Sequence, residues 1–183
     1  KEEILVPLRI VRESLEQNKS ENIASGDLLD LMRCTKCFGI NLAKLDIRQE
    51  SSRHTQLISE IIKKKYKSNY LNWSEEKKLD FLSTQIKSKK NLINNYQFRN
   101  KENREVWSTF KILAEQPKEC LGAYVISMTS SASDILSVTY LQKEAKIKNK
   151  LRVVPLFETL DDLKNANSIM TQLFTLSWYK KSI

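Results

Sequence analysis

The sequence predicts an α/β fold built on parallel strands. Three short apolar runs, at 42–48, 122–128 and 151–158, are each followed by a segment with the apolar spacing of an amphipathic helix. Alternation of strand and helix is typical of parallel β/α units, in which the crossover helices cover the sheet. The runs AYVISM and VVPLF are nearly continuous, which further predicts strands that are buried on both faces.

The composition is that of an ordinary globular domain. The chain has 183 residues, of which 40% are hydrophobic and 29% are charged, enough for one domain with a real core. No run approaches the roughly 18 apolar residues of a membrane span, and no signal peptide opens the chain. We therefore expect a cytoplasmic protein without a membrane partner. Because Lys1 stands first and the chain stops as a helical pattern ends, we also expect an excerpt from a longer chain.

The net charge of +9 raises the question of a nucleic-acid partner. The lysines gather at 63–67, 87–90 and 146–150, which are predicted helix ends or connections. Lysine is favourable in the last turn of a helix, where it meets the negative end of the dipole. We expect solvated helix ends and no nucleic-acid partner, and a basic nucleic-acid-binding domain stays as an alternative that salt-dependent binding to DNA would detect.

Two helices precede the first apolar run. Apolar residues from Ile4 to Leu15 recur at the spacing of one helix face, and Pro7 is tolerable if it lies in the first turn. The segment GDLLDLMRCTKCFG predicts a second helix that begins near Asp27 and ends at Gly39. The first strand is then expected at 42–48.

The spacing of Cys34 and Cys37 is that of some zinc and redox sites. A zinc site needs a second pair of ligands, yet the single histidine is His54 and Cys120 is far away in sequence. A redox motif should open a helix, whereas this pair lies near the end of a helical pattern. We therefore interpret the two cysteines as small residues on a helix.

Between the first and second apolar runs, helices are predicted at 52–66, 73–88 and 102–116. Ser74 is the expected N-cap of the second of them, and Pro117 ends the third. The intervening segment 89–100 is rich in Asn and has no period, so it is expected to be a loop. After 122–128 the segment TSSASD caps another helix, and after 151–158 Thr159 and Asp162 match the spacing of a capping box.

Each predicted strand ends in polar residues. Arg48 and Gln49 follow the first, Ser127 and Thr129 stand in and after the second, and Glu158 follows the third. The carboxyl ends of parallel strands share one side of a sheet or barrel, and ligands bind there. An Arg offers a planar fork for phosphate or carboxylate, and a Glu offers a hard oxygen for Mg²⁺ or Mn²⁺. The pattern predicts a site for an anionic substrate and a divalent cation.

A purely structural interpretation explains the same charges without a ligand. Arg48 and Glu158 can form an ion pair across neighbouring strands, or Arg48 can pair with Asp46 or Glu50. Structural ion pairs often imitate active sites, and periodicity alone does not separate the two interpretations.

Four segments taken together carry a resemblance to a known family. They are, in chain order, RCTKCFGINLAKLDIRQESSRHT, AYVISM, SASDILSVTYLQKEA and VVPLFETLDDLKNANSIMTQLF. In this order they closely resemble the middle of the phosphoenolpyruvate carboxylases. GDLLDLMR and SWYK also resemble that family, so the likeness covers nearly the whole chain and is weakest around 87–101.

The resemblance implies a partial (β/α)8-type, TIM-like barrel with about three parallel strands and many helices. It also implies the family's reaction, in which phosphoenolpyruvate and bicarbonate give oxaloacetate and phosphate with Mg²⁺ or Mn²⁺, and a homotetrameric enzyme. Carried over by motif, Arg48 of DIRQES is one of several arginines that bind the substrate phosphate. Glu158 of LFET is one of two carboxylates that ligate the metal.

Other motifs of the family do not occur in this sequence. They are a TAHPTE-like string with the catalytic histidine, GYSDSAKD with the second metal carboxylate, and a glycine-rich HGRGGSIGRGG loop. His54 is not a replacement for that histidine and is expected in the first turn of a helix. We therefore expect 1–183 to be a single internal fragment of the barrel domain, without catalytic residues and inactive alone.

An incomplete barrel leaves strand edges and apolar faces exposed, so we expect the isolated chain to self-associate or to repack helices over them. The alternative is a stand-alone binding or regulatory module derived from the same barrel segment. Retention of both Arg48 and Glu158 argues against it, because a binding module need not keep a metal ligand.

Overall fold

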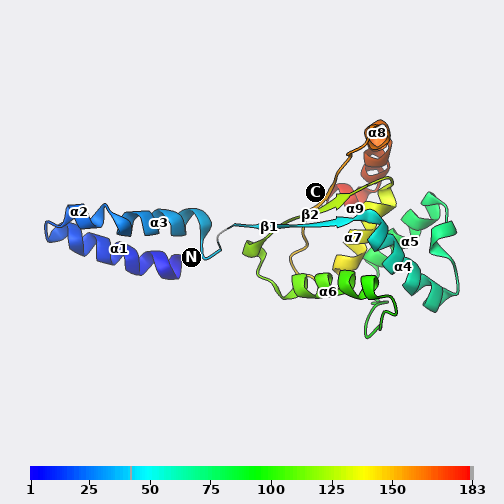
Figure 1. Ribbon diagram of the computed structural model, residues 1–183, viewed down its shortest axis with the longest axis horizontal. Helices are drawn as coiled ribbons and strands as arrows, with labels where there is room; N and C mark the ends of the chain where they lie inside the picture. Colours follow the sequence, from blue (N-terminus) through cyan, green and yellow to red (C-terminus); the bar gives the residue numbers. More distant parts are fainter. Residues whose placement is uncertain (42, 182–183) are drawn as a thin grey trace. The chain divides into compact units, whose positions relative to one another are not determined.

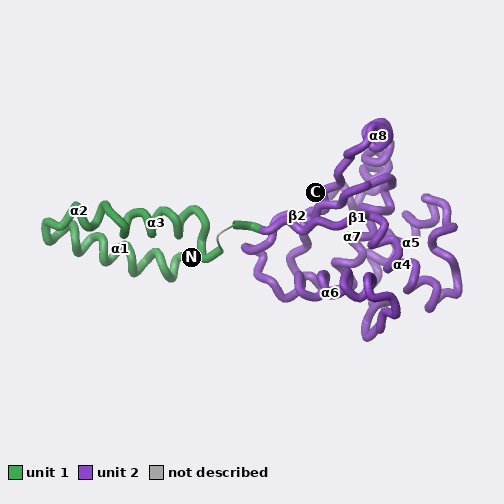
Figure 2. Tube along the Cα trace, viewed as in Figure 1, with its two compact units in different colours: residues 1–44 green, residues 45–183 purple. Residues whose placement is uncertain are grey.

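The computed structural model describes residues 1–41 and 43–181, so the expected strand start at Leu42 lies outside the described residues. The chain divides into two compact units, Lys1–Lys44 and Leu45–Ile183 (Figure 2). The first unit contains α1 (Glu2–Gln17), α2 (Glu21–Ala24) and α3 (Asp27–Phe38). The second contains β1 (Leu45–Glu50), α4 (Ser51–Tyr66), η1 (Tyr70–Asn72), α5 (Glu75–Lys87), α6 (Lys101–Glu115), η2 (Lys118–Cys120), β2 (Leu121–Ser127), α7 (Ala132–Glu144), β3 (Val153–Pro155), α8 (Leu160–Thr175) and α9 (Ser177–Lys180).

The first unit is a small helical assembly in which α1 packs against α2 and α3. Its buried residues are Leu5, Ala24 and Thr35. Pro7 does not meet the condition under which it would be tolerated, because it lies beyond the first turn of α1, where its missing N–H removes one helix hydrogen bond. The predicted end of α3 is confirmed, because Gly39 has a φ of 70° that favours glycine.

The second unit is built on a parallel sheet with strand order β1-β2-β3 (Figure 1). Arg48 is the register partner of Val125, which in turn pairs with Val154. The register shifts between Leu45 and Ile47. The expected α/β class with three parallel strands is therefore confirmed, and the sheet formed by the described residues is open.

Helices cover one face of this sheet, and the core lies between the helices and the sheet. Ile47 and its register partner Tyr124 belong to this face: Ile47 packs against the core, and the Tyr124 ring stacks on Phe110 of α6 with 5.3 Å between centroids. In Figure 1, α6 lies along one side of β1 and β2. The largest fully buried side chains are Tyr70, Tyr124, Tyr140, Phe110, Leu57, Ile58, Ile61, Ile62, Leu82, Ile93, Ile126 and Ile135.

The structure corrects the expected strand limits. Pairing with β2 continues through Gln49 and Glu50, so Arg48 and Gln49 lie inside β1 rather than after it. The third strand, expected at 151–158, is limited to Val153–Pro155. Burial on both faces, predicted for the second and third strands, is confirmed at Tyr124–Ile126 of β2, whereas the residues of β3 are only partly buried. On β1, Arg48 and Glu50 are exposed on the face away from the helices.

The predicted long helices are confirmed, with ends that differ by one or two residues. Ser74 is the N-cap of α5 and accepts a hydrogen bond from the Lys77 amide, and the Thr159–Asp162 capping box opens α8. The short helices α2, η1, η2 and α9 have no counterpart in the predictions, because a single turn leaves no periodic pattern. None of the helices within the described residues is long and apolar enough to cross a membrane.

Candidate active site

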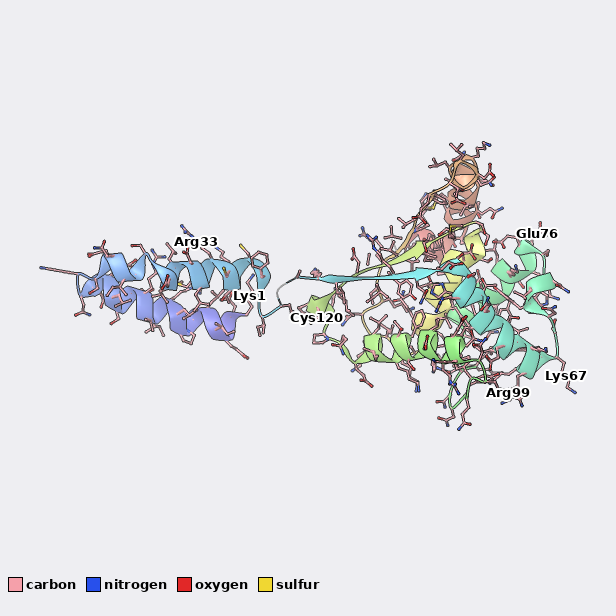
Figure 3. All side chains as sticks on the ribbon, in the orientation of Figure 1. Lys1, Arg33, Lys67, Glu76, Arg99 and Cys120 are labelled. Carbon is pink, nitrogen blue, oxygen red and sulfur yellow. The ribbon has the colours of Figure 1, made fainter. Side chains whose placement is uncertain are left out.

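The carboxyl edge of the sheet holds the two residues singled out from the sequence. Cys120, labelled in Figure 3, lies just before β2 and marks the amino edge, so the opposite edge follows Glu50 and Ser127, which are register partners. Arg48 precedes this edge by two residues on β1, and Glu158 follows β3. Both are exposed.

Arg48 projects from the face of the sheet that the helices leave uncovered. Side chains alternate along a strand, and the half-buried Ile47 faces the helices, so Arg48 faces the other way. Its register partner Val125 is buried, yet it is not part of the helix-covered core cluster. An arginine on this face presents its guanidinium to the surface that continues into the carboxyl edge.

The acidic neighbours of Arg48 have other partners. An oxygen of Asp46 accepts a hydrogen bond from the Ala123 amide at 2.8 Å, and Glu50 accepts one from the Ser52 hydroxyl at 2.6 Å. Within residues 1–41 and 43–181, the Arg48 side chain makes no hydrogen bond or ion pair, so the proposed pairings with Asp46, Glu50 or Glu158 are not formed. Its charge remains available for an anionic ligand.

Asp46 has a structural role that depends on a glycine. The side chain of Asp46 lies over Gly122, and a Cβ at Gly122 would overlap with the Asp46 carboxylate. This close approach coincides with the register shift between Leu45 and Ile47. The carboxylate thus fixes the start of β1 against β2, upstream of Arg48.

Glu158 is held at both its main chain and its side chain. Its amide donates to Asp162 at 3.2 Å, and one carboxylate oxygen, Oε2, accepts a hydrogen bond from the Met128 amide at 3.4 Å. Hydrogen bonds from the backbone and side chain of Thr159 lower the pKa of Asp162, which keeps this cap ionised. A carboxylate anchored through one oxygen leaves the other for a cation.

His54 lies on the helix-covered face of the sheet rather than at its carboxyl edge. It belongs to the first turn of α4, as predicted, and it is fully buried, with Nε2 hydrogen-bonded to the Tyr124 hydroxyl at 2.8 Å. Burial lowers the pKa of His54 to about 3 and raises the pKa of Tyr124. A neutral imidazole between α4 and β2 supports the sheet from behind and has no access to a ligand at the carboxyl edge.

One contact and one backbone conformation at this edge have no signal in the sequence. The Ser51 hydroxyl donates to the Met128 carbonyl at 2.6 Å, and Met128 has a φ of 53°, which is rare for a residue with a side chain. A Gly or Asn would have signalled such a turn, but Met gives no local signal. The contact also joins residues 77 positions apart, which no short motif reveals.

Other candidate features lie away from this edge. Cys34 and Cys37 are exposed thiols on α3, as interpreted from the sequence. A pocket borders the Asn-rich loop, and among its lining residues are Tyr96, Trp107 and Lys111. Neither Arg48 nor Glu158 lines this pocket, so it does not extend the site.

Comparisons with known proteins agree on one family. The family model for phosphoenolpyruvate carboxylase matches residues 1–183. A C4 phosphoenolpyruvate carboxylase from Flaveria trinervia is 45% identical over 182 residues, covering 100% of this chain and 19% of the relative. The enzymes from Proteus mirabilis and Acinetobacter baylyi are 45% and 46% identical, covering 97% and 100% of this chain and 20% and 21% of those relatives. The chain thus spans about a fifth of the length of these relatives, and it belongs to the phosphoenolpyruvate carboxylase family.

Proposed function

We propose that residues 1–183 are a single internal fragment of the barrel domain of a phosphoenolpyruvate carboxylase. The parent enzyme would convert phosphoenolpyruvate and bicarbonate into oxaloacetate and phosphate, as a carbon–carbon lyase. The observation that carries this proposal is the carboxyl edge of the sheet, where Arg48 and Glu158 occur in the family's motifs and on the edge where parallel sheets bind ligands.

Arg48 is the proposed phosphate-binding residue. An exposed guanidinium with no partner among the described residues has all its N–H donors free for phosphate oxygens. Charge on a transferring phosphoryl group is stabilised by such donors when they are already in place. Two features fix the strand that carries Arg48. They are the packing of helices against β1 and the hydrogen bond that Asp46 accepts from the Ala123 amide of β2.

Glu158 is the proposed metal ligand, and Mg²⁺ or Mn²⁺ is the proposed cation. Its exposed carboxylate fits a hard divalent cation, although the described residues hold no group of three or more candidate metal ligands. Glu158 would therefore supply one ligand, and the second carboxylate would come from elsewhere in the enzyme. When bound, the cation would neutralise negative charge that develops on the substrate.

Arg48 and Glu158 would be surrounded by further strands of the barrel in the intact enzyme. Three parallel strands with crossover helices are compatible with part of a (β/α)8 barrel, whose missing strands would adjoin β1 and β3. The catalytic histidine is proposed to lie outside residues 1–183. We propose a cytoplasmic homotetramer for the intact enzyme, and the exposed, reduced thiols of Cys34 and Cys37 are compatible with that location. The isolated chain is proposed to self-associate through its uncovered faces.

A coupled oxaloacetate assay with phosphoenolpyruvate, bicarbonate and Mg²⁺ tests this function. The native-length polypeptide should turn over, and the 183-residue chain should not. In the native-length polypeptide, Arg48→Ala should lower kcat/KM by roughly 100-fold because a donor to the phosphate is lost. Arg152→Ala is the matched control, since Arg152 is an exposed arginine before β3, near the amino edge. Sustained turnover by the 183-residue chain, or equal rates for the two variants, would overturn the proposal.

A further inference from the structure

The turn that follows β2 contains a residue in an unfavourable backbone conformation. Met128 has a φ of 53°, in the left-handed region that L side chains seldom occupy. Its side chain is 51% exposed, so burial of the side chain does not explain why this conformation is kept. Strained residues persist where neighbouring contacts over-determine them, and they concentrate at functional sites.

Both backbone groups of Met128 are bound by the neighbouring strand ends. Its carbonyl accepts a hydrogen bond from the Ser51 hydroxyl at 2.6 Å, and its amide donates to Glu158 Oε2 at 3.4 Å. Ser51 directly follows β1 and is 6% exposed, while Glu158 follows β3. One residue after β2 thus links the carboxyl ends of all three strands.

We infer that Ser51 and Met128 are positioning residues that hold the Glu158 carboxylate ready for the divalent cation. The inference rests on the proposed function, in which Glu158 is a metal ligand. The Met128 amide occupies one carboxylate oxygen and leaves the other free. Ser51 holds the Met128 carbonyl and so helps to fix the φ and ψ of Met128, which direct its amide toward Glu158. Hydrogen bonds of this kind orient ligands in metal sites and affect metal affinity although they never touch the metal.

The contacts of Asp162 show that it holds the main chain near Glu158 and not the Glu158 carboxylate. Asp162 accepts from the amides of Glu158 and Thr159, so it fixes the main chain at the start of α8. Among the described residues, no hydrogen bond joins Asp162 to the Glu158 carboxylate, which accepts its hydrogen bond from Met128. The orientation of the carboxylate therefore depends on the turn after β2 rather than on the helix cap.

The test is the affinity of the native-length polypeptide for Mn²⁺ alone, measured by electron paramagnetic resonance titration. Ser51→Ala should raise the Mn²⁺ Kd roughly tenfold, in line with losses of outer hydrogen bonds at metal sites. Ser52→Ala, which removes the neighbouring hydroxyl that contacts Glu50, should leave the Kd within about twofold. Circular dichroism checks that each variant is folded.

A second pair of variants changes Met128 through its backbone preference. Met128→Gly suits a positive φ and should keep the parental Kd, whereas the β-branched Met128→Val disfavours it and should weaken Mn²⁺ binding. Because the side chain is half exposed, neither variant removes much packing. Parental affinity in both Ser51→Ala and Met128→Val, with weakened binding in Glu158→Gln, would overturn this inference alone. Unchanged affinity in Glu158→Gln would instead remove the proposed metal ligand.

Discussion

The two compact units of this chain contain similar kinds of residues but bury them very differently. In Leu45–Ile183, apolar side chains from six α-helices and three strands meet in one core in which Leu57, Phe110 and Ile126 have 0% exposure. In Lys1–Lys44, the buried apolar residues are Leu5 and Ala24. Its large exposed apolar residues are Ile4, Val6, Ile10, Val11, Ile23, Leu31, Phe38 and Ile40.

The difference teaches that an amphipathic pattern does not say what will cover it. Both units form the helices that their sequences predict, yet the second buries its apolar faces in a large core, whereas most large apolar residues of the first remain exposed. Units of about 40 residues seldom bury enough surface for independent stability. We therefore expect the second unit to contribute most of the stability of this chain.

The largest expected effect is a cavity in the core of the second unit. Phe110→Ala should lower the free energy of unfolding by about 3–5 kcal/mol, because the ring is fully buried and stacks on Tyr124. Ile112→Ala, on the same helix but 56% exposed, should change it by no more than about 0.5 kcal/mol. Urea denaturation followed by circular dichroism measures both, and equal losses would contradict the assignment of the core.

The second expected effect is a dependence of stability on pH that only the second unit should show, because the single histidine, His54, lies there. The pKa of His54 is about 3 in the folded protein, against an ordinary value near 6.5 when unfolded. Stability is therefore complete above about pH 6.5 and falls below it by about 1.4 kcal/mol per pH unit, since only the unfolded state readily takes up the proton.

Between pH 6.5 and pH 5, most carboxylates stay ionised, so this interval isolates the histidine. Protonation would place a charge in the core, and the imidazolium would carry an N–H at Nδ1 for which the described residues offer no acceptor. Urea denaturation at several pH values should show a loss of about 2 kcal/mol over the interval. A stability that stays flat down to pH 5 would show that His54 is not buried as described.

A smaller effect is expected at the start of β1. Gly122→Ala should destabilise the second unit by about 1–3 kcal/mol, because the added methyl group displaces the Asp46 carboxylate and leaves the Ala123 amide without its acceptor. Gly26→Ala is the matched control in the first unit, where the nearest atom to an added Cβ is at an ordinary 3.4 Å. Thermal unfolding measures both, and a neutral Gly122→Ala would remove Asp46 from this role.

The smallest effect on stability is expected in the first unit. Ile10→Glu should change the free energy of unfolding by no more than about 0.5 kcal/mol, because Ile10 is 62% exposed. It should nevertheless weaken self-association of the 183-residue chain, since it places a charge on an uncovered apolar surface. Sedimentation velocity measures the association. If the unsubstituted chain were purely monomeric at high concentration, self-association through the first unit would be contradicted.

The parts of this fold that were predictable are those with a local pattern. The periodic helices, the capping box at Thr159 and the parallel strands follow from spacing alone, and Arg48 and Glu158 lie near the carboxyl edge of the sheet, where their place at the ends of apolar runs predicted them. The limits of β1 were misplaced because backbone pairing, rather than apolar character, decides that Gln49 and Glu50 belong to the strand.

What could not be predicted depends on contacts between distant residues. The hydrogen bond from Ser51 to Met128 and the close approach of Asp46 to Gly122 join segments that the sequence separates widely. Burial of His54 against Tyr124 likewise requires β2 to lie beside α4. The uncovered surface around Ile10 was also missed, because a helical pattern is the same whether or not a partner covers it.

The most direct test of the central claim, that this chain is an internal part of a larger carboxylase, is the intact mass of the native polypeptide purified from its source. The chain has a mass of 21.4 kDa and covers 19% and 20% of two relatives, so the native product should be about five times heavier. A native product of about 21.4 kDa would contradict the claim and would favour a stand-alone binding module that uses the barrel segment for another purpose.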